Sequence, residues 1–163
     1  MQNRLKPIVP PQGIEVITKG KHMTIKNAQG ELIILVSQSG VAAADAGTQR
    51  SLTANAIIGL TTGFTKALEI QGTGYKALPK DKGLELFLGF SHPIQFEAPN
   101  GITLTVKDNR LITVAGADKY LVGQTAANLR RLRQPDVYKG KGIRYLGEVI
   151  KLKPGKAAKA AEA

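Results

Sequence analysis

The stretch HPIQFEAPNGITLTVKDNRLITVAGADK, residues 92–119, has the pattern of a β-hairpin and indicates the fold most clearly. Residues 102–107 alternate apolar and polar side chains, and a period of two is typical of a half-buried strand. Asp108 and Asn109 follow, and these residue types tolerate the left-handed backbone angles of a tight turn. The returning strand is predicted over residues 111–114.

A similar stretch, KPIVPPQGIEVITKGKHMTIKNAQG, occupies residues 6–30. Pro11-Gln12-Gly13-Ile14 aligns with Pro99-Asn100-Gly101-Ile102, an offset of 88 residues. Each copy contains two strand-like runs around a polar turn, with Gly20 at the turn of the first copy. Self-similarity at this offset predicts an internally duplicated chain.

A helix is predicted after the second hairpin. Asp118 is placed to cap its start, and Pro135 is expected to stop it, with three arginines in its last turn. Five residues fall on one apolar face. They are Leu121, Val122, Thr125, Ala126 and Leu129.

A helix is also predicted after the first hairpin, over residues 48–60, and Gly63 is expected to end it. Four of its apolar residues have helical spacing and are expected to face the core. They are Leu52, Ala56, Ile57 and Leu60.

Strands are predicted between the copies over residues 64–77 and 84–90, joined through a turn at 79–83. The loop 134–142 precedes a last strand-like run, 143–152. The sum is an α+β fold of two tandem repeats, each a mostly antiparallel sheet with one packed helix. The predicted domains are residues 1–78 and 79–153, followed by a low-complexity tail, 154–163, that we expect to be flexible.

The composition excludes several classes of protein. With 42% apolar residues in 163, the chain has enough material for a packed core. It has no cysteine and only two histidines, which excludes disulfides and the usual zinc sites, and no cofactor is expected. The longest apolar runs, 32–36 and 56–60, are far shorter than a membrane-spanning helix, so no membrane partner is expected.

Positive charge is concentrated in the C-terminal third of the chain. The net charge is +11, yet residues 119–156 alone hold ten basic and two acidic side chains. A general role in solubility would not require this concentration. The distribution favours a polyanion, and nucleic acid above all, as the partner of this segment.

The segment PDVYKGKGIRY, residues 135–145, combines cations, glycines and tyrosines. Lysines neutralise phosphates, an arginine can bind a phosphate or a base edge with two donors, and glycines allow a close backbone approach. The tyrosines could stack on RNA or close the protein core, and the sequence leaves both alternatives open. The predicted RNA-binding residues are Arg130, Arg131, Arg133, Tyr138, Lys139, Gly140, Lys141, Gly142, Arg144, Lys151 and Lys153.

Two other motifs give weaker signals. The run Gly72-Thr73-Gly74-Tyr75 has the glycine spacing of a dinucleotide loop, but Pro79 and a hairpin turn follow it where such a loop needs a helix. We interpret it as a bulge or a close packing point. Ser91 and His92 are adjacent on an extended chain, so their side chains point apart and a catalytic role is disfavoured. No enzymatic activity is expected.

Residues 135–143, PDVYKGKGI, resemble the signature of the bacterial large-subunit ribosomal protein six family. Further similar segments occur in family order, and together they cover most of residues 7–153. They include Gly72-Thr73-Gly74-Tyr75, Gly89-Phe90-Ser91-His92-Pro93, Gly116-Ala117-Asp118-Lys119 and Val122-Gly123-Gln124.

The resemblance implies a structural constituent of the large ribosomal subunit, built by internal duplication, whose C-terminal domain makes most of the ribosomal RNA contact. It implies a place near the stalk base and the sarcin-ricin loop, beside neighbouring ribosomal proteins and close to docked translational GTPases. The expected location is a cytoplasmic ribosome, or an organelle with a bacterial-type ribosome. A general RNA-binding architectural or chaperone module is the alternative.

The sequence departs from the family pattern in the first repeat. Family members usually carry another pair of strands between the first hairpin and the first helix, whereas only residues 37–46 lie there in this chain. We therefore expect a shortened first repeat.

Overall fold

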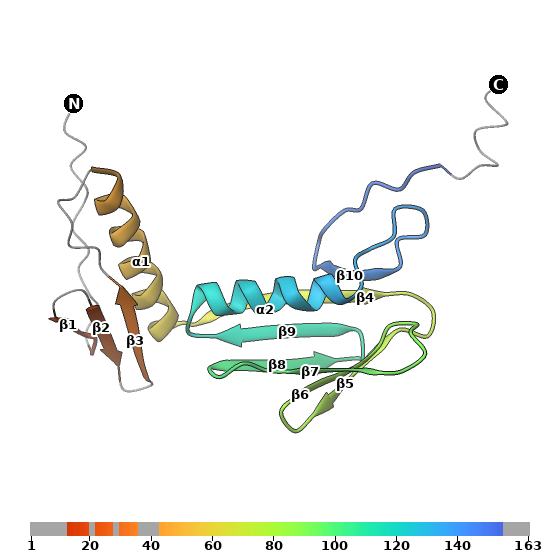
Figure 1. Cartoon of the computed structure of the whole chain (residues 1–163), viewed down its shortest axis with the longest axis horizontal. Helices are drawn as coiled ribbons and strands as arrows, with labels where there is room; N and C mark the ends of the chain where they lie inside the picture. The colour runs from red at the N-terminus through yellow and green to blue at the C-terminus, as the bar shows by residue number, and fades with distance from the viewer. Residues whose placement is uncertain (1–12, 20–21, 28–29, 36–42, 155–163) are drawn as a thin grey trace. The chain divides into compact units, whose positions relative to one another are not determined.

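The computed structural model describes residues 13–19, 22–27, 30–35 and 43–154 of the chain. These residues form two compact units (Figure 1). The first unit contains the described residues up to Phe64 together with Gly116–Lys119, and the second contains Thr65–Ala115 and the residues from Tyr120 onward. The α+β class and the mostly antiparallel pairing predicted from the sequence are confirmed.

The first unit is a three-stranded antiparallel sheet packed against one helix. Its strands are β1 (Glu15–Lys19), β2 (His22–Asn27) and β3 (Gly30–Leu35), in that order, and its helix is α1 (Ala43–Thr61). Ile25 of β2 is fully buried against α1, so the amphipathic pattern of the hairpin supplies this core. The Nδ2 group of Asn27 donates to the Leu60 carbonyl at 2.9 Å and ties the sheet to the end of the helix.

Helix α1 differs in part from its prediction. Ala56, Ile57 and Leu60 are buried as expected, and Gly63, with a φ of 73°, follows the helix end as expected. Leu52, however, is 42% exposed, so its predicted core position is wrong. The buried apolar residues of α1 in the described chain all lie between residues 56 and 60, where the helix meets β2 and the segment around Ala117.

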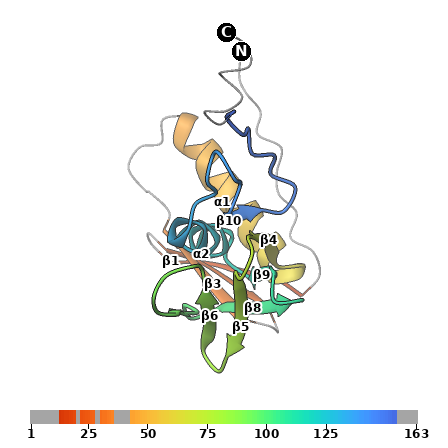
Figure 2. The same cartoon turned by 90° about the vertical axis from the view of Figure 1, so that its right-hand side faces the viewer.

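The second unit contains two sheets and one helix. Helix α2 (Lys119–Leu132), whose first residue belongs to the first unit, lies against one face of the four-stranded sheet (Figures 1 and 2). The strand order is β10–β4–β9–β8 in this sheet and β5–β6–β7 in the other. The strands are β4 (Phe64–Gln71), β5 (Lys76–Lys80), β6 (Gly83–Phe87), β7 (Ile94–Glu97), β8 (Ile102–Lys107), β9 (Leu111–Gly116) and β10 (Gly142–Tyr145).

The core of the second unit lies between α2 and its sheet. Four of the five residues predicted for the apolar helix face are buried, and Leu121 is half-buried. Facing them are the fully buried side chains of β4, β9 and β10. The buried set is Val122, Thr125, Ala126 and Leu129 of the helix with Leu68, Ile70, Ile112, Val114 and Ile143 of the sheet.

The β8–β9 hairpin has the structure that its sequence predicts. Strand β8 has the predicted bounds, and its apolar residues are more buried than the threonines between them. Asp108 and Asn109 both have positive φ, 54° and 55°, which are the angles of a tight two-residue hairpin turn. The strand pairs β1–β2 and β8–β9 lie in the two similar stretches of sequence, residues 6–30 and 92–119. That the chain arose by duplication stays a prediction.

Four predicted strands have other bounds in the structure, and one of them, 111–114, continues to Gly116 in β9. Residues 64–77 form not one strand but β4 and β5, because Gly72 and Gly74 adopt positive φ and turn the chain. The run 84–90 is strand only as β6, since a turn begins beyond Phe87. The run 143–152 is strand only as β10, because Glu148 N donates to the Tyr145 carbonyl at 3.0 Å in a turn.

The predicted domain boundary differs from the boundary between the compact units, and some other predictions fall on residues outside the described ranges. The predicted domain division at residue 78 assigns β4 to the first repeat, whereas Thr65–Gln71 lies in the second compact unit because β4 pairs with β10. The turn at Gly20, most of the shortened segment 37–46 and residues 155–163 of the predicted tail lie outside the described residues.

A glycine on α1 gives a test of the first core. A Cβ atom on Gly59 would lie 1.9 Å from the Ala117 carbonyl oxygen, so we expect Gly59→Ala to destabilise the first unit by about 1–3 kcal/mol. Gly47→Ala on the same helix meets nothing within 4 Å and should stabilise the helix by roughly 0.5–1 kcal/mol. Hydrogen exchange of the α1 amides measures both variants. Equal protection in the two would contradict this packing.

Candidate nucleic-acid interface

The interface begins at the C-terminal end of α2. Arg130 and Arg131 lie in the last helical turn, as predicted, whereas Arg133 lies just beyond the helix, which ends at Leu132. Pro135 follows shortly, where a helix cannot continue. The Arg133 carbonyl accepts a hydrogen bond from Ile143 N at 2.8 Å. The helix end is therefore fastened to β10, and the residues between them form a loop.

Asp136 organises this loop. Its carboxylate accepts from Lys139 N at 3.1 Å, its carbonyl accepts from Gly140 N at 2.9 Å, and its own N–H donates to the Lys141 carbonyl at 2.9 Å. Gly140 adopts a φ of 67°, a conformation that glycine accepts most easily. These bonds hold Tyr138 and Lys139 at an exposed tip.

The segment after β10 returns along the same loop. Lys153 N donates to the Val137 carbonyl at 2.8 Å, and the Cδ2 atom of Leu152 lies 3.6 Å from the place a Cβ on Gly140 would take. Lys151 and Lys153 are both exposed. This hydrogen bond brings the cations of the C-terminal segment to the loop that carries Lys139.

The two glycines of the loop serve different purposes. A Cβ on Gly142 would lie 2.6 Å from the Gln134 carbonyl oxygen and 2.7 Å from the Pro135 Cα atom. Gly142 is also buried and has a φ of 151°. The missing side chain of Gly142 thus makes room for the protein's own backbone at the base of the loop, whereas Gly140 lies nearer the tip.

Two of the predicted RNA-binding arginines form ion pairs within the protein. Arg130 Nη2 lies 2.6 Å from Glu148 Oε1, and Arg144 donates through Nε and Nη2 to Glu69 Oε2 at 3.1 and 2.9 Å. The side chains of these pairs are only 27–31% exposed, which strengthens the attraction relative to a fully solvated pair. Both guanidinium groups are therefore held by carboxylates.

Glu148 joins three parts of the site. One carboxylate oxygen contacts Arg130, and the other accepts from Tyr145 N at 3.0 Å. The Tyr145 hydrogen bond and the positive charges of Arg130 and Arg144 hold the pKa of Glu148 below its ordinary value. The Arg130 guanidinium also lies 5.6 Å from the centre of the Tyr145 ring.

The structure separates the two tyrosines whose roles the sequence left open. Tyr145 is half-buried and the Arg130 guanidinium lies over its ring, so this tyrosine packs within the unit. Tyr138 is 59% exposed at the loop tip, where its ring is available to a partner. The exposed cations of the predicted set are Arg131, Arg133, Lys139, Lys151 and Lys153, and Lys141 is half-buried.

The weaker motifs lie elsewhere in the second unit. Gly72-Thr73-Gly74-Tyr75 turns the chain from β4 into β5 and opens no helix, so its interpretation as a packing point is confirmed. Ser91 Oγ and His92 Nδ1 are exposed and 3.5 Å apart, so the expectation that these two side chains point apart is wrong. Within the described ranges, no three histidine or acidic residues gather to hold a metal ion. None of the helices described has the length and hydropathy needed to span a bilayer.

Sequence reasoning missed three residues of this site. Glu69 and Glu148 fix the arginines, and Phe90 lies under Arg133, whose guanidinium is 5.2 Å from the ring centre. Glu69 is separated from Arg144 by 75 residues, and no local pattern connects them. Arg130 lies in α2 and Glu148 follows β10, 18 residues later, and again no local pattern connects the two residues.

Comparison with known proteins gives consistent matches. A family model described as ribosomal protein L6 matches residues 71–146, from the end of β4 to just beyond β10. Proteins named large ribosomal subunit protein uL6 are 47% identical in Persephonella marina, over 93% of this chain and 95% of the relative, and 44% identical in Salinispora tropica, over 94% and 96%. The protein of that name in Magnetococcus marinus is 44% identical, over 93% and 96%.

The alignment with the Persephonella marina protein spans 171 positions, more than the 163 residues of this chain. The relative therefore carries residues that this chain lacks. The predicted shortening of the first repeat itself stays a prediction.

The lowered pKa of Glu148 predicts that the stability of the second unit depends on pH. Because its folded pKa is lowered, its contribution is present above the ordinary value near 4.5 and is lost as the pH falls through the folded pKa. We expect Glu148→Gln to lower the free energy of unfolding at pH 7 by about 1 kcal/mol and the difference from the native protein to shrink below pH 4.5.

Tyrosine fluorescence during urea unfolding measures this effect in the second unit, because the chain has no tryptophan and all four tyrosines lie there. Glu97→Gln, at an exposed carboxylate on β7, is the control and should change little. A constant difference between Glu148→Gln and the native protein from pH 7 to pH 3 would contradict the role of the ionised carboxylate.

Proposed function

This chain belongs to the ribosomal protein L6 family, and we propose on that premise that its second unit binds large-subunit ribosomal RNA near the stalk base and the sarcin-ricin loop. Membership makes it a structural component of the large ribosomal subunit and not an enzyme. Its relatives are bacterial ribosomal proteins. In the proposed place it contacts neighbouring ribosomal proteins and braces the RNA beside which translational GTPases dock.

One observation carries the proposal for the second unit. Residues 119–156 hold ten basic and two acidic side chains, and hydrogen bonds gather most of these cations around the end of α2, the loop and the segment after β10. The two acidic residues, Asp136 and Glu148, both bond to groups within the protein. The surplus charge of the exposed cations is therefore directed outward, where phosphates neutralise it.

We assign the predicted RNA-binding residues to two roles. The exposed or half-exposed cations form the phosphate-facing set, which comprises Arg131, Arg133, Lys139, Lys141, Lys151 and Lys153. Arg130 and Arg144 are positioning residues, because Glu148 and Glu69 offset their charges and hold them partly buried. Gly142 shapes the base of the loop, Gly140 turns its tip, and Tyr138 offers a ring at the tip.

The geometry favours recognition of folded RNA by shape. Cations on a helix end, a closed loop and a returning segment are fixed relative to one another by backbone hydrogen bonds. The major groove of an RNA duplex is too deep and narrow for side chains to read its bases, so a fixed array of phosphate contacts selects for the shape of the RNA backbone. We therefore expect affinity for a particular RNA fold with slight dependence on base sequence.

The loop lysines give the direct test of this interface. Replacing Lys139 and Lys141 together by alanine should weaken binding to large-subunit ribosomal RNA and flatten the dependence of log affinity on log salt by about one unit for each phosphate that is no longer neutralised. Filter binding across a series of salt concentrations measures the slope. Lys107→Ala is the matched control, since β8 lies at the opposite edge of the sheet from β10. An unchanged slope in the double variant would remove these lysines from the interface.

Association with the ribosome is tested in a cell lysate. We expect the protein to sediment with large ribosomal subunits in a sucrose gradient and to stay with them in high salt, because many fixed contacts act together. Detection by mass spectrometry follows the protein through the fractions. If it stays at the top of the gradient and bulk RNA competes equally with ribosomal RNA, a general RNA-binding module is the better description.

A further inference from the structure

We propose that Phe90, with Arg133 on its ring, is a stacking site for an unpaired base of the ribosomal RNA. The inference rests on the proposed function and adds a contact by an uncharged side chain to the phosphate contacts made by the cations. Phe90 belongs to the loop between β6 and β7, outside the residues that the sequence assigned to RNA.

The exposure of Phe90 is the first observation. Leu88 is 1% exposed and anchors the start of the loop in the core, whereas Phe90, two residues later, is 42% exposed. Gly89 between them has a φ of 76°, which turns the chain outward. The outward turn therefore leaves part of a large aromatic ring at the surface, where a flat partner can reach it.

The contact with Arg133 is the second observation. The guanidinium carbon of Arg133 lies 5.2 Å from the centre of the Phe90 ring, within the range of a cation–π contact. Arg133 is itself exposed and belongs to the phosphate-facing set. The ring is thus placed beside a cation of the proposed RNA interface, although the two residues are 43 apart in the sequence.

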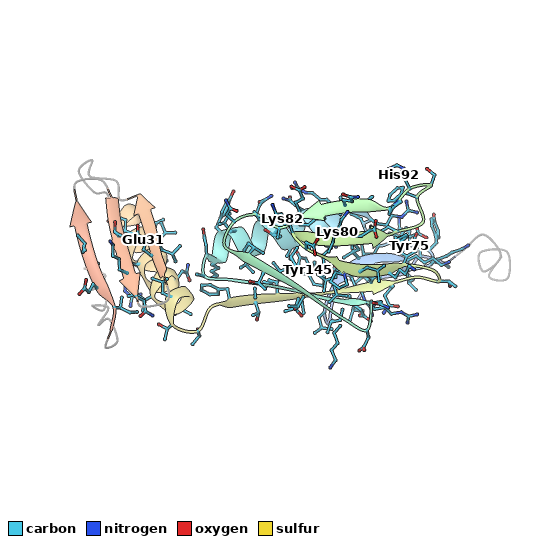
Figure 3. All side chains as sticks on the ribbon, turned by 90° about the horizontal axis from the view of Figure 1, so that it is seen from below. Glu31, Tyr75, Lys80, Lys82, His92 and Tyr145 are labelled. Atoms are coloured by element: carbon cyan, nitrogen blue, oxygen red, sulfur yellow. The ribbon has the colours of Figure 1, made fainter. Side chains whose placement is uncertain are left out.

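The loop that carries Phe90 is held from within by Tyr75. A Cβ on Gly72 would lie 2.9 Å from the Tyr75 Cδ2 atom, and a Cβ on Gly89 would lie 2.9 Å from its Cε1 atom. Both glycines therefore leave room for one tyrosine ring, which joins the turn after β4 to the loop after β6. Figure 3 shows Tyr75 and His92 at the same end of the second unit. A loop fixed in this way gives up little conformational freedom on binding.

The chemistry around the ring suits RNA. Residues 86–96 contain no acidic side chain, and Ser91 and His92 beside Phe90 are exposed polar groups. Single-stranded bases of RNA stack on aromatic side chains and on arginine planes, and this contact tolerates any base because every base has a flat face. An apolar protein partner would gain no advantage from the charge of Arg133 at the ring.

Substitution of the ring tests the proposal. We expect Phe90→Leu to weaken binding of the full chain to a full-length large-subunit ribosomal RNA transcript by roughly 5- to 100-fold, the effect typical of removing one stacked base. The salt dependence should keep its native slope, because no charge is removed. Phe90→Trp keeps an aromatic face and should retain most of the affinity. Circular dichroism checks that each variant is folded.

The chain offers a matched control pair. Lys76 Nζ lies 4.7 Å from the centre of the Phe87 ring, so this pair repeats the cation–aromatic contact on β5 and β6. Phe87→Leu should leave the affinity for RNA unchanged. If Phe90→Leu binds as tightly as the native protein while the Lys139 and Lys141 variant is weakened, the stacking site is wrong and the proposed function stands. If the native protein shows no preference for ribosomal RNA, the proposed function itself fails.

A photo-crosslink identifies the class of molecule that covers the ring. A benzophenone amino acid introduced at residue 90 of the protein in intact large ribosomal subunits should form its crosslink with RNA. A crosslink only to another protein would overturn the proposal and identify Phe90 as part of a protein contact.

Discussion

The pairing of β10 with β4 fixes both the strand and the loop of the candidate interface. Its antiparallel register sets Ile143 opposite Ile70 in the core and Arg144 opposite Glu69 on the other face, where the two side chains form an ion pair at 2.9 Å. The loop 134–141 leaves the end of α2 and must return at the start of β10. Because α2 is fixed by its buried face and β10 by this register, the two ends of the loop are fixed, and Asp136 needs only a few hydrogen bonds to set its shape.

The distribution of carboxylates explains why some cations face outward and others do not. With a net charge of +11, the chain has few carboxylates to pair with its cations, and residues 119–156 contain only two acidic side chains. Asp136 forms its hydrogen bonds with the backbone of the loop, and Glu148 holds Arg130 and Tyr145. The carboxylates inside the unit thus pair with partly buried arginines, because an unpaired charge destabilises the fold most where it is buried. The exposed cations keep their charge for the RNA that we propose as their partner.

The features predicted correctly from the sequence are those that local patterns determine. Alternation and two turn residues specify the β8–β9 hairpin, and helical spacing specifies the buried face of α2. The turn at residues 72–75 was missed because apolar residues continue on both sides of it, and β10 was predicted too long because a turn at Gly147 interrupts a run of strand-like residues. The pairs Arg144–Glu69 and Arg133–Phe90 depend on which strands and loops become neighbours, so only the folded chain reveals them.

The two units also differ in how many of their charged side chains are paired within the unit. In the first unit Lys26 and Glu31 are opposite one another on β2 and β3 and form an ion pair at 3.0 Å, so the charges are balanced across the sheet. Helix α1 is followed within three residues by β4, whereas α2 is followed by a basic loop, β10 and a returning basic segment. If the hairpin-and-helix frame is the repeated element, the cations that we propose to face RNA lie mainly in the part of the chain that follows the second copy. An interface of this kind can change in charge without disturbing either core, because its cations lie outside the buried faces that hold each frame together.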